Sequence, residues 1–177
     1  MAKKNIRPEC QLKLAAVKIS SSNRYLKRMI TKKPAHADPH NNMSALLDAE
    51  HIAATLQPAQ QWEQRYRYLL GLAKMAQQLQ AVPEEPAFAV AGCEAPVWLK
   101  IECQNNRCYY YTRSSSRLIA GLLVVLFAPV QGKPHSALSE FNFNHWLTSC
   151  GLQQQLTPSR SNGLYQIYSH AKQAITD

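Results

Sequence analysis

Thirteen consecutive residues, Leu118 to Val130, contain no charged side chain, and this run limits the folds open to the chain more than any other segment. A membrane-spanning helix needs about 20 apolar residues, whereas this run is shorter and is interrupted by Gly121 and Pro129. A helix that is apolar on nearly every side is stable in water only where other elements cover it. We therefore expect a helix from Arg117 to about Ala128 at the centre of a packed domain.

Regular spacing of apolar residues predicts further helices on both sides of this run. Ser44 is the expected N-cap of a first helix that ends before Pro58. Two later helices are expected from Phe143 to Cys150 and from about Ser159 toward Ile175. Between Gln60 and Gln80 the apolar residues recur every three or four positions, which predicts a long helix with one buried face: Trp62, Tyr66, Leu69, Leu70, Ala73, Ala76 and Leu79.

The segment from Val97 to Cys103 alternates apolar and polar side chains, which is typical of a strand with one buried face. Residues Gln104 to Arg107 predict a turn, and Cys108 to Thr112, with three consecutive tyrosines, predict the returning strand of an antiparallel hairpin. One hairpin among several helices indicates an α+β fold, in which a small antiparallel sheet packs against helices on one face.

The net charge of +9 is concentrated at the amino-terminal end of the chain. Residues 1–42 hold ten Lys/Arg and two acidic residues, a net charge of +8, whereas residues 43–177 have a net charge of +1. We expect a basic, mobile extension over residues 1–42 and one domain over residues 43–177. The extension also resembles an organelle transit segment, or results from an over-extended reading frame whose natural start is Met43.

The five cysteines are an odd number at irregular spacing, and no apolar signal-peptide core precedes them. This pattern favours a reducing, cytoplasmic location. Cys103 and Cys108 flank the hairpin turn and are expected to be ordinary strand cysteines, neither disulfide-bonded nor bound to zinc. Cys150 is expected to pack within a helix, and Cys10 belongs to the extension. The six histidines show no metal-ligand spacing, so no metal site is expected.

Cys93 differs from the other cysteines because it lies in a segment, Val90 to Pro96, where Gly92 and Pro96 favour an exposed turn. Reactive side chains collect on loops held by rigid flanks, but a buried structural cysteine is equally compatible with these residues. The nearest charge is Glu94, and no cation lies close in sequence to lower the pKa of the thiol. A self-contained cysteine hydrolase, which needs a neighbouring base, is therefore disfavoured.

The sequence around Cys93 resembles the glycine-cysteine loop followed by Val-Trp of the SufE/CsdE family of sulfur acceptors. Three more segments resemble family motifs in the same order, so the resemblance covers about residues 45 to 172, and its details lean toward the CsdE branch. The four segments are Gly92-Cys93-Glu94-Ala95-Pro96-Val97-Trp98-Leu99, Gln61-Trp62-Glu63-Gln64-Arg65-Tyr66, Arg117-Leu118-Ile119-Ala120-Gly121-Leu122-Leu123 and Leu156-Thr157-Pro158-Ser159-Arg160-Ser161-Asn162-Gly163-Leu164.

This resemblance implies a SufE/IscU-like fold and a role in sulfur transfer. Cys93 would accept persulfide sulfur from a cysteine desulfurase of the SufS/CsdA type and stimulate that enzyme. The sulfur would then pass to iron-sulfur cluster assembly, on a scaffold protein, or to thiolation. The chain would be a stoichiometric carrier rather than an enzyme, with no cofactor of its own, since the pyridoxal phosphate belongs to the desulfurase.

Several residues are expected to support the Cys93 loop, namely Gly92, Glu94, Trp98 and Arg160. A surface cap or ion pair is an equally open role for Arg160. We also expect an apolar collar around the bound sulfur, formed by Ala91, Val97 and Trp98.

The chain departs from the family pattern just before the central helix. Where family members usually have an acidic turn, this chain has the basic segment Thr112 to Arg117. If this turn contacts the desulfurase, partner choice is altered. Two other functions stay open: a nucleic-acid-binding module that acts through residues 1–42, and a cysteine hydrolase with a histidine close to Cys93. Membrane attachment is not expected.

Overall fold

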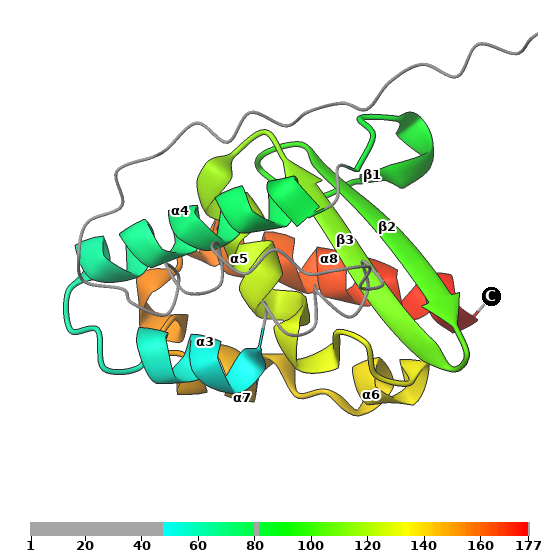
Figure 1. Ribbon diagram of the computed structural model, residues 1–177. Coiled ribbons are helices and arrows are strands. Elements are labelled where there is room, and N and C mark those ends of the chain that lie inside the picture. The colour runs from blue at the N-terminus through cyan, green and yellow to red at the C-terminus, as the bar shows by residue number, and fades with distance from the viewer. Residues whose placement is uncertain (1–47, 80–81, 177) are drawn as a thin grey trace, which may run out of the picture. The chain divides into compact units, whose positions relative to one another are not determined.

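The computed structural model describes residues 48–79 and 82–176, which belong to one compact unit of helices and a small sheet (Figure 1). The predicted extension, residues 1–42, lies outside these described residues. Within them, no helix is long and apolar enough to cross a membrane. In chain order the elements are α3 (Ala49–Leu56), α4 (Trp62–Leu79), η1 (Pro86–Phe88), β1 (Ala89–Val90), β2 (Val97–Gln104), β3 (Arg107–Ser114), α5 (Arg117–Phe127), η2 (Ala128–Val130), α6 (His135–Glu140), α7 (Phe143–Ser149), η3 (Gln153–Gln155) and α8 (Pro158–Thr176).

The sheet is antiparallel in the order β1-β2-β3, and its main part is the predicted hairpin. Its turn is shorter than predicted and consists of Asn105 and Asn106 alone, with φ angles of 51° and 59°. Asparagine tolerates this left-handed conformation, which a two-residue hairpin turn needs to match the twist of its strands. The edge strand β1 was not predicted, because two residues are too few to show an alternating pattern.

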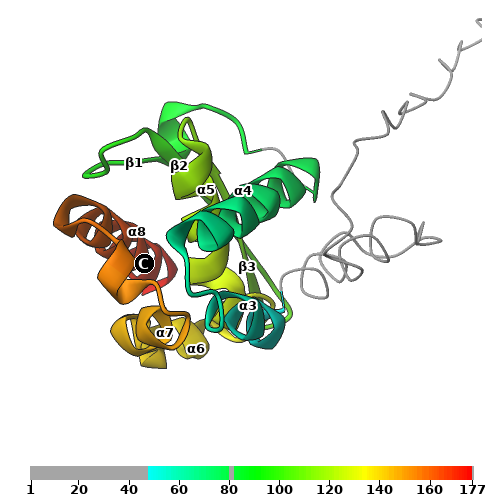
Figure 2. The ribbon, with the colours of Figure 1, turned by 90° about the vertical axis from the view of Figure 1, so that its left-hand side faces the viewer.

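The apolar helix predicted at the centre is α5, and every residue from Ile119 to Phe127 is buried. Ser116 caps its amino-terminal end, where the side-chain oxygen accepts a hydrogen bond from the Ile119 N–H at 3.4 Å. The sheet covers one side of α5, and the Tyr110 ring of β3 stacks on Phe127 at 4.8 Å. Helices α4 and α8 cover other sides, as the two ribbon views show (Figures 1 and 2).

Helix α4 packs against α5 at a glycine. A Cβ atom added to Gly121 would lie 2.7 Å from the carbonyl carbon of Leu69, an atom of the α4 backbone. The two helices can therefore approach this closely only because residue 121 has no side chain. The buried face of α4 agrees with the predicted one at Leu69 and Ala73, whereas Tyr66 is 37% exposed.

Two sequence predictions are corrected by the structure. Helix α3 is capped by Asp48, whose side chain accepts from the Glu50 N–H, and not by Ser44, which lies outside the described residues. Cys103 and Cys108 form a disulfide instead of remaining unpaired. They are direct partners in the β2–β3 register, with Cα atoms 4.1 Å apart, so the register places two thiols within bonding reach. A disulfide was not predicted, because a reducing compartment disfavours one even where two cysteines flank a hairpin turn.

Gly121→Ala should destabilise the domain by about 3 kcal/mol, because the new methyl group would overlap the α4 backbone and force the central helices apart. Equilibrium unfolding in urea measures this loss. Gly71→Ala is the matched control, since nothing lies within 4 Å of a Cβ at that position in α4. It should leave stability unchanged or raise it by up to about 1 kcal/mol. Equal effects of the two substitutions would contradict the assigned α4–α5 contact.

Candidate functional site

The loop that presents Cys93 connects β1 to β2 and approaches helix α8 closely. Gly92 has a φ of +90°, a conformation that L-residues with side chains rarely adopt. A Cβ atom there would also lie 3.4 Å from the Gln166 side chain of α8. The positive φ explains why glycine precedes the cysteine, and the short distance shows how closely the loop approaches α8.

The two ends of this loop are fixed by the sheet. Val90 pairs with Val97 in the antiparallel ladder, which closes the loop at its base. The Pro96 carbonyl accepts hydrogen bonds from the Ser114 hydroxyl at 2.9 Å and from the Ser115 N–H at 3.2 Å. Cys93 therefore lies on a short loop with rigid flanks, the setting expected of a functional side chain.

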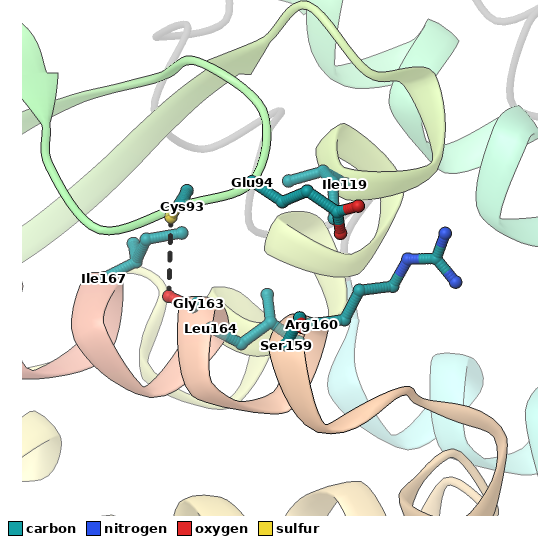
Figure 3. Close-up of a pocket in the computed structure, with 8 residues that line it drawn as sticks. All are labelled: Cys93, Glu94, Ile119, Ser159, Arg160, Gly163, Leu164 and Ile167. Atoms are coloured by element: carbon teal, nitrogen blue, oxygen red, sulfur yellow. Dashed lines mark hydrogen bonds between the residues drawn. The ribbon is translucent and has the colours of Figure 1, made fainter.

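The Cys93 thiol is half-buried and turned toward α8 (Figure 3). It donates a hydrogen bond to the Gly163 carbonyl, with the sulfur and oxygen atoms 3.5 Å apart. Beside it is a small pocket, open to solvent, between the loop and helices α5 and α8. The lining residues are Cys93, Glu94, Ile119, Ser159, Arg160, Gly163, Leu164 and Ile167.

The environment of the thiol favours its protonated form. Burial raises the pKa of the Cys93 thiol above its ordinary value, because a thiolate loses hydration there. The hydrogen bond to Gly163 also requires the proton. No histidine is among the described residues that line the pocket. The hydrolase interpretation therefore lacks the histidine that it needs.

The structure brings some of the predicted site residues to this pocket and not others. Glu94 and Arg160 both line it, and in Figure 3 their side chains extend in the same direction away from the sulfur. Trp98 is on β2, half-buried, and is not part of the lining. The residues predicted as an apolar collar, Ala91, Val97 and Trp98, do not line this pocket, whose apolar walls are Ile119, Leu164 and Ile167.

These apolar walls were missed because they are distant from Cys93 in sequence. Ile119 is at the start of α5, and Leu164 and Ile167 are in α8, so their spacing indicates only that they are buried. A signal was present: Ile119 and Leu164 lie within two of the segments that resemble family motifs. No pattern in either segment indicates that the two meet at one pocket.

The basic turn before α5 is adjacent to the Cys93 loop. Ser114 and Ser115 bond to the loop through the Pro96 carbonyl, as described above. Arg113 pairs with Glu84 and donates to the Val82 carbonyl at 3.4 Å. The unusual positive charge at position 113 is therefore offset by an acidic residue of this same chain.

The remaining described cysteines offer no comparable site. Cys150 is fully buried, and burial raises the pKa of its thiol to about 12. Cys103 and Cys108 are joined to each other. Among residues 48–79 and 82–176, no group of three or more His, Cys, Asp or Glu side chains is arranged to hold a metal ion.

Known proteins are similar to this chain in sequence and in fold. The family model described as "SufE: Fe-S metabolism associated domain" matches residues 50–175. The sulfur acceptor protein CsdE of Escherichia coli is 38% identical over 120 residues, which cover 66% of this chain and 80% of that protein. An uncharacterized SufE-like protein of Haemophilus influenzae is 32% identical over 122 residues, covering 66% of this chain and 94% of that protein.

A solved structure agrees with the fold. The solution structure of a hypothetical protein from Thermus thermophilus matches with a TM-score of 0.53, covering 76% of this chain and 96% of that chain. At 18% sequence identity this is a likeness of fold alone. It supports the α+β architecture predicted from the sequence.

The rate at which iodoacetamide alkylates Cys93 should rise with pH through a midpoint above about 8.5, the pKa of an exposed cysteine. The reason is that only the thiolate reacts and burial raises the pKa of this thiol. The chain unfolded in urea is the reference and should show the ordinary midpoint. Mass spectrometry of the Cys93 peptide gives both rates.

The raised pKa of the Cys93 thiol also makes the stability of the folded state depend on pH. Because the folded pKa is above the unfolded one, the folded state holds the proton more tightly. The resulting stability is fully present below the unfolded pKa and is lost as pH rises through the folded pKa. A Cys93→Ser chain should lack this part of the pH dependence. A folded midpoint at or below the unfolded one would contradict the described burial of the thiol.

Proposed function

Because this chain belongs to the SufE family, we propose that it accepts persulfide sulfur on Cys93 from a cysteine desulfurase and passes it to a downstream acceptor. One observation carries the proposal: a half-buried thiol, on a loop with fixed ends, lies beside a pocket with apolar walls. The arrangement suits a group that must be reached by a partner protein and otherwise protected.

The proposed step is a thiol exchange in which atoms and charges balance. The Cys93 thiolate attacks the terminal sulfur of the persulfide on the desulfurase cysteine. A new S–S bond forms to Cys93, the S–S bond within the desulfurase breaks, and the desulfurase cysteine leaves as a thiolate. The Cys93 proton passes to solvent or to the leaving thiolate, so no external oxidant or reductant is consumed.

Because the pKa of the thiol is raised, the partner protein would have to activate it. At neutral pH the free thiol is mostly protonated and unreactive, and no histidine is among the described residues of the pocket. Docking of the desulfurase would have to release Cys93 from its bond to Gly163 and help to remove the proton. Sulfur would then be accepted only where a donor is present.

The pocket would protect a persulfide on Cys93 from reduction. Ile119, Leu164 and Ile167 form apolar walls around the thiol, which limit the approach of small thiols that would reduce a persulfide. Delivery is a second exchange of the same kind, in which an acceptor cysteine attacks the terminal sulfur and Cys93 leaves as a thiolate. The acceptor would be a scaffold for iron-sulfur clusters or a thiolation enzyme.

Removal of sulfur would also explain stimulation of the desulfurase. An enzyme whose cysteine remains persulfidated cannot begin another cycle, so a protein that takes the sulfur raises turnover. Pyridoxal phosphate belongs to that enzyme, and this chain supplies only the acceptor thiol. It is thus proposed to be a stoichiometric carrier rather than a catalyst, acting in the cytoplasm.

Cys93→Ser should abolish stimulation of a cysteine desulfurase of the SufS/CsdA type, because serine cannot form a persulfide. Sulfide release from cysteine in the presence of a reductant measures turnover. Cys150→Ala is the matched control, since that thiol is fully buried and has no proposed part in transfer. It should stimulate as well as the unchanged chain. Equal stimulation by the Cys93→Ser chain would refute the proposal.

A further inference from the structure

We propose that Gly163 is a specificity-determining residue, whose missing side chain leaves the space that the terminal sulfur of a Cys93 persulfide occupies. The proposal rests on the sulfur-acceptor function proposed above and assigns a role to a further residue of the same pocket. Gly163 is in the sixth position of α8, away from either end of this long helix. It lines the pocket together with Cys93, Ile119, Leu164 and Ile167 (Figure 3).

Three described glycines lie within helices, and their surroundings differ. At Gly121 a side chain would overlap the backbone of α4, so packing alone requires the glycine. At Gly71 nothing lies within 4 Å of an added Cβ. At Gly163 the added Cβ would face Cys93, at 3.6 Å from its sulfur and 3.7 Å from its Cα. Gly163 is therefore the one of these three that faces the reactive residue.

The distances at Gly163 imply that an alanine fits beside the free thiol but not beside the persulfide. A separation of 3.6 Å is ordinary van der Waals contact, so the domain with a free thiol accommodates an alanine at this position. A persulfide extends the side chain by an S–S bond of about 2.05 Å. A sulfur atom at that distance from Sγ, placed on the side of residue 163 but clear of the α8 backbone, would come inside contact distance of a methyl group there. The glycine is thus dispensable for the thiol and needed for the persulfide.

The hydrogen bond at this position changes on loading as well. In the unloaded chain the Cys93 S–H donates to the Gly163 carbonyl. Once Cys93 bears a second sulfur atom, its own sulfur has no proton to donate. The loaded side chain is then retained by its fit between the apolar walls and the bare backbone of α8. A methyl group at residue 163 removes part of that fit and moves the terminal sulfur toward solvent.

The experiment compares the unchanged chain with Gly163→Ala and Gly71→Ala, which make the same substitution within a helix. Each is loaded with sodium tetrasulfide, so that no desulfurase interface is involved. The Cys93 thiolate attacks a terminal sulfur of the tetrasulfide dianion and forms the persulfide, and a trisulfide dianion leaves. After removal of excess donor, intact mass follows the loss of the added sulfur in dithiothreitol.

Gly163→Ala should shorten the lifetime of the persulfide about fivefold or more, as expected when one methyl group overfills a packed site. Gly71→Ala should match the unchanged chain within about twofold, as surface substitutions usually do. Equal lifetimes in all three chains would overturn the proposal. A wild-type chain that takes no sulfur would overturn the acceptor function and this site together, whereas normal loading with equal lifetimes overturns the site alone.

Alkylation of the unloaded thiol provides a second measurement. A substitution that only displaced the loop would change the alkylation rate. Iodoacetamide should react with Cys93 at the same rate in all three chains, within about twofold, because an alanine at residue 163 only touches the free thiol. If Gly163→Ala accelerates alkylation as much as it shortens the persulfide lifetime, the methyl group has displaced the loop in both states. That result would also overturn the proposal.

Discussion

The need to cover α5 on every side determines most of this structure. Its backbone meets α4 at Gly121, its Phe127 ring stacks on the sheet, and its Val125 carbonyl accepts a hydrogen bond from Trp146 of α7 at 2.8 Å. Helix α8 covers a further side. The Cys93 loop approaches α8 next to the start of α5, so the pocket forms where these three parts of the chain meet. The site is thus a consequence of how the apolar helix is enclosed.

The thiol chemistry follows from that enclosure. Burial keeps Cys93 protonated, and the proton is used in a bond to the α8 backbone, so the resting cysteine is a poor nucleophile. For a self-contained enzyme this would be a defect, whereas for a carrier it prevents reaction with stray electrophiles before a partner docks. The neighbouring basic turn is joined to the same loop, and its Arg113 pairs with Glu84 of this chain.

Elements with long and regular patterns could be predicted from the sequence, and short or long-range features could not. The apolar run and the spacing of Trp62 to Leu79 identified α5 and α4, because burial imposes a period on many residues at once. The strand β1 has only two residues, and the Cys103–Cys108 disulfide depends on a cross-strand register. Arg65 is a further case: it is 8% exposed, and its Nε donates to the Leu56 carbonyl at the end of α3. Cys93 was predicted as the site from its loop together with the family resemblance, but its pocket walls come from two distant helices.

The central claim is that Cys93 itself receives the sulfur, and the most direct measurement is to locate transferred sulfur in the chain. A cysteine desulfurase supplied with cysteine bearing radiolabelled sulfur is mixed with this protein, and the product is digested without reductant. The account predicts label in the peptide that contains Cys93 and none in the peptide that contains Cys150, in an amount of at most one sulfur per chain. Label confined to another peptide, or none bound covalently, would contradict it.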